Sequence, residues 1–86
     1  MTSSTVHARA NGSILLHFDG EVLEVFGEPN ALRFHVAEGL SMEISEGRGV
    51  RCNISTGQKL RISLNVDVER VEDVRKLARA VEFAIQ

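Results

Sequence analysis

The last stretch of the chain, Asp67 to Gln86, limits the fold most strongly. Its apolar residues recur at steps of three and four, and at 100° per residue they share a stripe roughly 140° wide along one side of a helix. About eighteen helical residues make a rod of roughly 27 Å, and its apolar stripe must pack against another layer of structure. The stripe consists of Val71, Val74, Leu77, Ala78, Val81, Ala84 and Ile85.

Acidic residues mark the expected start of this helix. Asp67 suits the N-cap position, where its side chain can accept a free backbone N–H of the first turn. Glu69, Glu72 and Asp73 follow it, and the helix macrodipole favours negative charge at this end. We therefore expect the helix to begin directly after Asp67.

The layer beneath the helix is expected to be a sheet. Residues 13–66 contain short runs of alternating apolar and polar residues, separated by turns, at a spacing typical of antiparallel strands joined by short loops. One helix would cover a flat sheet of this size only in part. We therefore predict an α+β fold in which a curved antiparallel meander of about six or seven strands forms a half-open barrel, closed by one C-terminal helix.

Turn residues set the expected pairing of these strands. Asp19-Gly20 is a favoured two-residue hairpin turn, which would pair Leu16 with Leu23. The next turn, at residues 27–30, would place Glu24 opposite Arg33.

Later turns extend this pattern across the sheet. Residues 37–39 fit a three-residue hairpin loop with Gly39 in the left-handed conformation, which would set Met42 against Phe34. A row of alternating charge would then cross four strands at Glu24, Arg33, Glu43 and Arg51.

Length and composition are those of one globular domain. The 86 residues include 43% hydrophobic and 26% charged residues, which predicts an ordered core. Residues 1–12 are expected to form a tail or a weak edge strand, and residues 13–86 a single domain. A net charge of −2 gives no reason to expect nucleic acid as a partner. The lack of an apolar leader or membrane-spanning run indicates a cytoplasmic location.

Few residues suggest chemistry. His17 and His35 would lie two strands apart, roughly 10 Å from each other, which is too far to share one metal ion. Cys52 alternates into the apolar face, where a thiol is inert. No nucleophile–base pair or pair of carboxylates emerges from the expected pairing. We therefore expect no catalytic residue, no metal and no cofactor, and a protein that is not an enzyme.

Apolar residues off the predicted core are the candidate interface. Leu15, Val22 and Phe26 fall on the outer face of the first hairpin, and Phe83 projects almost opposite the helix stripe. Clustered exposed apolar area tends to mark an interface. Two alternatives remain open, namely that residues 1–12 cover this face or that the exposure is incidental.

These features favour a non-catalytic protein-interaction or assembly module. Its partner would be another protein or a second copy of the chain, as in a homodimer formed through the first hairpin. The alternative is a domain that binds a small ligand or a lipid in the open end of the sheet.

A meander of strands followed by one C-terminal helix resembles the order of elements in pleckstrin-homology-like (PH-like) domains. Phe18-Asp19-Gly20-Glu21 and Arg33-Phe34-His35-Val36 are similar to stretches of small bacterial domains of that superfold. The resemblance covers residues 13–85 and implies the PH-like fold. The chain lacks the basic first loop of lipid-binding members and has no tryptophan, so the resemblance implies no phosphoinositide specificity.

Overall fold

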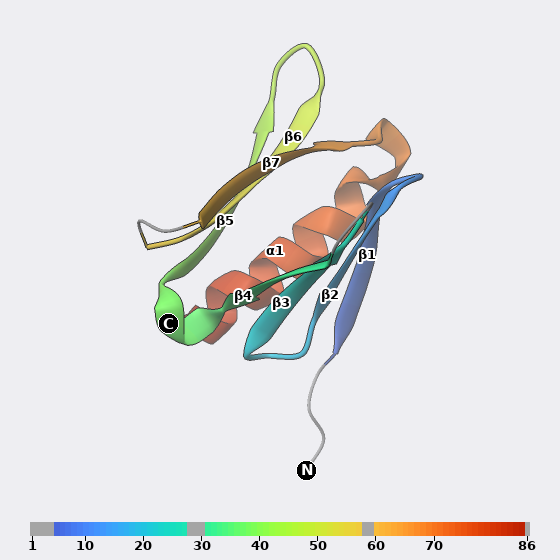
Figure 1. The fold of residues 1–86 in the computed structure, drawn as a ribbon. Coiled ribbons are helices and arrows are strands. Elements are labelled where there is room, and N and C mark those ends of the chain that lie inside the picture. Colours follow the sequence, from blue (N-terminus) through green and yellow to red (C-terminus); the bar gives the residue numbers. More distant parts are fainter. Residues whose placement is uncertain (1–4, 28–30, 58–59, 86) are drawn as a thin grey trace.

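The computed structural model describes residues 5–27, 31–57 and 60–85 (Figure 1). These residues form strands, two short 3-10 helices (η1 and η2) and one α-helix. Along the chain the elements are β1 Val6–Asn11, β2 Ile14–Phe18, β3 Val22–Phe26, β4 Ala31–His35, η1 Val36–Glu38, β5 Leu40–Glu46, β6 Val50–Thr56, β7 Leu60–Val66, η2 Val68–Arg70 and α1 Val71–Ile85.

The strands form two antiparallel sheets. The first sheet has the order β1-β2-β3-β4 and the second the order β5-β6-β7, and the two face each other with α1 between them (Figure 1). The α+β class, the antiparallel strands and the C-terminal helix are thus confirmed. The single continuous meander is not confirmed, because the strands divide into two sheets between β4 and β5.

The division occurs where a hairpin was predicted. Residues 36–38 form the 3-10 turn η1, so β5 pairs with β6 and the predicted contact of Met42 with Phe34 across a hairpin is wrong. Gly39 does adopt the expected left-handed conformation, with φ 82°. Its carbonyl accepts a hydrogen bond of 3.1 Å from the backbone N–H of Gly57, which ties the start of β5 to the end of β6.

In the first hairpin, the side chains lie on the predicted faces of the sheet, but the strands pair in a different register from the one predicted. Leu16 pairs with Val25 and Phe18 with Leu23, a shift of two residues from the predicted pairing that leaves each side chain on its predicted side. The cause lies in Asp19, whose Oδ1 accepts the backbone N–H groups of Glu21 and Val22 at 2.9 and 2.8 Å. This Asx-type turn is longer than the predicted two-residue loop.

The β3–β4 pairing follows the prediction. Glu24 lies opposite Arg33, and Arg33 Nε donates a hydrogen bond of 2.9 Å to Glu24 Oε2. The rest of the predicted charge row is wrong, because Glu43 pairs with Asn53 and lies in the other sheet.

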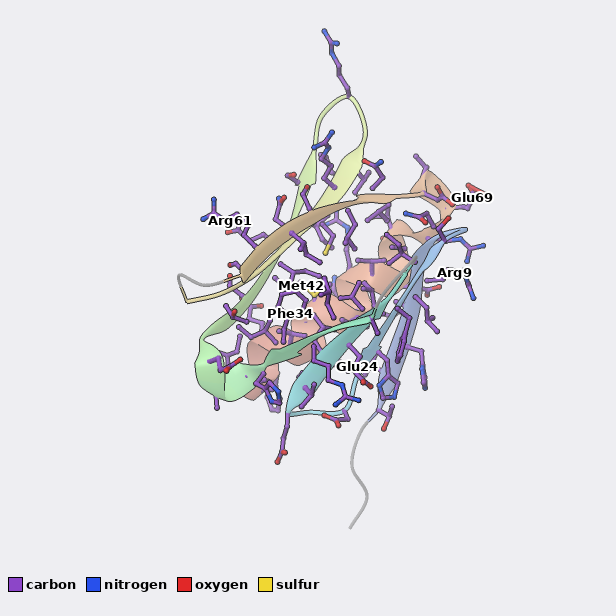
Figure 2. All side chains as sticks on the ribbon, viewed as in Figure 1. Arg9, Glu24, Phe34, Met42, Arg61 and Glu69 are labelled. Carbon is purple, nitrogen blue, oxygen red and sulfur yellow. The ribbon has the colours of Figure 1, made fainter. Side chains whose placement is uncertain are left out.

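Helix α1 fills the space between the two sheets. It packs against β1 of one sheet and β5 of the other, while β1 and β7 meet at one corner, where the Asp67 N–H donates to the Ala10 carbonyl at 2.8 Å. Figure 2 shows Phe34 and Met42 directed from the two sheets toward this shared interior. The fully buried side chains come from both sheets and the helix, and include Leu16, Phe18, Leu23, Phe34, Cys52, Ile54, Val74, Leu77 and Val81.

The α-helix begins at Val71, three residues later than predicted. Asp67 precedes the 3-10 turn η2 and makes no capping hydrogen bond with its side chain. Instead its Oδ2 lies 3.7 Å from Arg70 Nε, and its carbonyl accepts the Arg70 N–H at 2.8 Å. The turn carries Val68 out of the predicted helix and into solvent. No helix in the described part of the chain is long and apolar enough to cross a membrane.

Candidate functional site

The predicted hairpin interface lies on the outer face of the first sheet, and the structure divides it. Leu15 pairs directly with Phe26, so these two side chains adjoin. Val22 pairs with His35 at the other end of the same strands. Leu15 is half-buried and Phe26 is 39% exposed, which leaves only a small apolar patch.

A polar row separates the two parts of that face. The rings of His7 and His17 lie 4.6 Å apart between centroids, and His17 Nδ1 is 3.6 Å from Glu24 Oε1. Glu24 in turn holds Arg33. Arg9 and Glu24 mark this outward-facing side in Figure 2. The row is a set of solvated cross-strand contacts across all four strands.

The histidines do not assemble a metal site in the described residues. His17 and His35 belong to different rows, and His7, which the sequence did not place, is the true neighbour of His17. Throughout residues 5–27, 31–57 and 60–85, no three His, Cys, Asp or Glu side chains come together as ligands.

Cys52 lies fully buried in the core face of β6. Burial in apolar surroundings raises the pKa of its thiol to about 12. The thiol is therefore protonated and unreactive at neutral pH, in keeping with the sequence interpretation.

β1 runs along the edge of the first sheet, beside β2. This strand, Val6–Asn11, lies within residues 1–12, for which the sequence predicted either a tail or a weak edge strand. It extends the sheet sideways, with Arg9 paired to the half-buried Leu15, and Phe26 stays 39% exposed. Its core-facing side chains include Ala8 and Ala10, whose small size lets α1 approach closely.

A larger apolar surface surrounds Phe83. This residue is 81% exposed and borders a groove of about 550 Å³ between the C-terminal half of α1 and the ends of β1 and β2. We call this the α1–β1 groove, and its walls are formed by Val6, Phe18, Gly20, Lys76, Arg79, Ala80, Phe83 and Ala84.

Two cations flank this apolar floor. Lys76 and Arg79 precede Phe83 by seven and four residues, so all three share one flank of the helix. Within the described chain neither cation belongs to an ion pair, and no carboxylate is among the groove walls that the structure describes. An apolar hollow with two basic side chains at its rim can hold an apolar group that carries negative charge beside it.

The opposite flank of α1 has a different character. The α1–β5 groove has a volume of about 200 Å³ and is lined by Met42, Ile44, Arg75, Ala78, Arg79 and Glu82. Here Arg75 forms an ion pair with Glu46, and Glu82 lies beside Arg79 in the lining. This flank therefore contains one ion pair, and Arg79 borders both grooves.

Sequence reasoning found Phe83 but missed its surroundings. Lys76, Arg79 and Ala80 stand seven, four and three residues before it, a helical spacing that was visible in the sequence. The contribution of Val6 and Phe18 was not visible, because it depends on where α1 crosses the edge of the first sheet.

Comparison with protein-family models, with curated proteins and with solved structures finds no match to this chain. The PH-like resemblance therefore remains a prediction, and the groove geometry has to support any functional proposal.

Proposed function

We propose that this chain is a non-catalytic protein-interaction module that binds its partner in the α1–β1 groove. One observation carries the proposal, namely that Phe83 is 81% exposed at the rim of a hollow whose other walls include Val6, Phe18, Ala80 and Ala84. Exposed aromatic side chains beside apolar hollows are typical of binding surfaces.

The groove is a better candidate than the outer face of the first sheet. That face offers Leu15 and Phe26 as one adjoining pair, with Val22 beyond the polar row. The groove instead offers a concave apolar floor that can enclose a side chain, and enclosure is what gives a hot spot its energy.

Selection of peptides from a displayed random library tests the proposal. The selected peptides should bind the native chain and should lose at least about tenfold in affinity with Phe83→Ser or Ala80→Gln, since each change alters the groove. Ala78→Gln is the matched control, because Ala78 is also half-buried on α1 but lines the opposite groove. Peptides that bind all variants equally, or failure to select any peptide, would contradict the proposal.

A second candidate function follows from the same two cations. A fatty acid could place its chain on the apolar floor and its carboxylate against Lys76 or Arg79. Laurate would then raise the melting temperature of the native chain and of Ala78→Gln, but not of Ala80→Gln. This result, without any groove-dependent peptide, would favour the small-ligand alternative over the protein-interaction module.

A further inference from the structure

Two apolar side chains stand out from the rest of the surface. Val68 is 79% exposed and Phe83 is 81% exposed, whereas the next most exposed large apolar residue in the described chain, Ile85, is at 46%. Val68 lies in η2 just before α1, and Phe83 lies near the end of α1. The two most exposed large apolar side chains of the described residues therefore lie just before α1 and near its end.

The charges around these two side chains are opposite. Val68 is flanked by Asp67 and Glu69, and we call these three residues the acidic knob. Glu69 is exposed and in no ion pair of the described chain, and Figure 2 shows it at the N-terminal end of the helix. Asp67 is partly balanced by Arg70, at 3.7 Å.

Acidic charge continues into the first turn of α1, at Glu72 and Asp73. The surroundings of the acidic knob are therefore net negative. Further along the helix, the α1–β1 groove carries Lys76 and Arg79, five and eight residues after the first residue of α1.

We infer that the acidic knob of one copy of this chain docks into the α1–β1 groove of another copy. Val68 would enter the apolar floor beside Phe83, and the carboxylates of Asp67 and Glu69 would face Lys76 and Arg79. This inference rests on the proposed function and names the partner.

The geometry favours contact between different copies over other arrangements. Val68 precedes α1 and Phe83 lies twelve residues after its first residue, which is roughly 18 Å of helix at 1.5 Å per residue, so Val68 cannot reach Phe83 of its own chain. A symmetric pairing of two grooves would set Lys76 and Arg79 against their own copies, which like-charge repulsion opposes. Docking of unlike surfaces produces open chains or rings, and the smallest closed form is a reciprocal dimer in which each copy places its acidic knob in the groove of the other.

The contact is small, so the association is expected to be weak. The acidic knob offers three consecutive residues, well below the size of a stable interface, and we expect a dissociation constant on the order of 100 µM or above. Charge attraction between exposed groups is screened by salt, so association should weaken as the salt concentration rises.

Light scattering with refractive-index detection over a dilution series tests the inference. At low salt the mass-average molar mass should rise with concentration up to about 1 mM, to that of a reciprocal dimer or of larger assemblies. Val68→Ser/Glu69→Lys, which disables the acidic knob, and Lys76→Glu/Arg79→Glu, which disables the groove, should each weaken association at least about tenfold. Arg48→Glu/Arg61→Glu is the matched control for the groove variant, because it makes the same change of net charge as Lys76→Glu/Arg79→Glu at exposed sites outside the groove.

Mixing the two disabled variants gives the decisive result. One retains its groove and the other its acidic knob, so the mixture should form a 1:1 dimer and nothing larger. A native chain that stays monomeric throughout, or disabled variants that do not combine, would each overturn the inference. Circular dichroism of every variant establishes that it is folded.

The outcome separates this inference from the proposed function. Groove-dependent peptides combined with a monomeric native chain would overturn only the docking of one copy on another. Failure to obtain peptides together with a monomeric native chain would overturn both.

Discussion

The two flanks of α1 each border a hollow lined by apolar and charged side chains, but the hollows differ in volume and in ion pairing. On the β5 side, Arg75 is paired with Glu46 and the hollow holds about 200 Å³. On the β1 side, the hollow holds about 550 Å³ and its cations, Lys76 and Arg79, belong to no ion pair of the described chain. The difference is that one flank contains an ion pair within the chain, whereas the cations of the other flank form none with the described residues.

Leu77→Ala should have the largest effect, because it removes support common to both flanks. Leu77 is fully buried between the helix and the sheets. Truncation of such a side chain leaves a cavity and should cost about 2–5 kcal/mol of unfolding free energy. Urea denaturation followed by circular dichroism measures this cost, and a loss below about 1 kcal/mol would contradict the described packing.

Raising the pH tests the burial of Cys52 in the core beneath both flanks of α1. The folded-state pKa of Cys52 is raised to about 12 from 9.0, so the folded chain keeps this proton to higher pH than the unfolded chain does. Stability is therefore fully present below pH 9 and falls as pH rises toward 12, by on the order of 1–3 kcal/mol between pH 9 and 11. Urea titrations at both pH values measure the fall.

Cys52→Ala is the control for that experiment. The variant lacks the thiol, so the part of the pH dependence caused by Cys52 should disappear even if overall stability is lower. Equal pH slopes for the native chain and the variant would contradict a raised thiol pKa.

Met42→Ser and Phe83→Ser compare the two grooves directly. Met42 is half-buried against the core, so its replacement should cost about 1–2 kcal/mol. Phe83 is exposed, so its replacement should change the stability of the monomer by less than about 0.5 kcal/mol. Chemical denaturation at low protein concentration makes the measurement, and equal costs would show that Phe83 packs within its own chain.

Arg75→Gln should have the smallest effect. It breaks the ion pair with Glu46, which is partly exposed, and should cost less than about 1 kcal/mol. Lys76→Gln should change stability by no measurable amount, because Lys76 has no ion-pair partner in the described chain. Thermal denaturation at low and high salt tests both, and only the Arg75→Gln difference should shrink in high salt.

The sequence predicted local structure well and long-range structure poorly. Alternation of apolar residues placed the strands, and Phe18 and Phe34 reached the core as expected, since side-chain faces depend only on the period of a strand. The register after Asp19 was wrong because the side chain of this residue reorganises the turn, which a two-residue turn rule does not consider. The break at residues 36–38 was missed because a short loop permits either a hairpin or a change of sheet.

Some residues of the candidate site could also be predicted from local sequence pattern, whereas others depended on long-range structure. Phe83 was predictable, since helical periodicity alone places it away from the stripe. Val68 was not, because its exposure depends on the 3-10 turn that delays the start of α1. The residues of the predicted hairpin interface lie on the predicted face of the sheet. Which of them adjoin depends on the strand register, and in the observed register Val22 is separated from Leu15 and Phe26.

A concentration series of amide NMR spectra tests most directly whether the two flanks of α1 differ in function. Between about 20 µM and 1 mM, the amide signals of residues 67–69 and 76–84 should shift together, while those of Met42 and Ile44 remain in place. Signals that shift at Leu15 and Phe26, or around Met42 and Ile44, with residues 76–84 unchanged, would contradict the assignment of the α1–β1 groove as the binding surface.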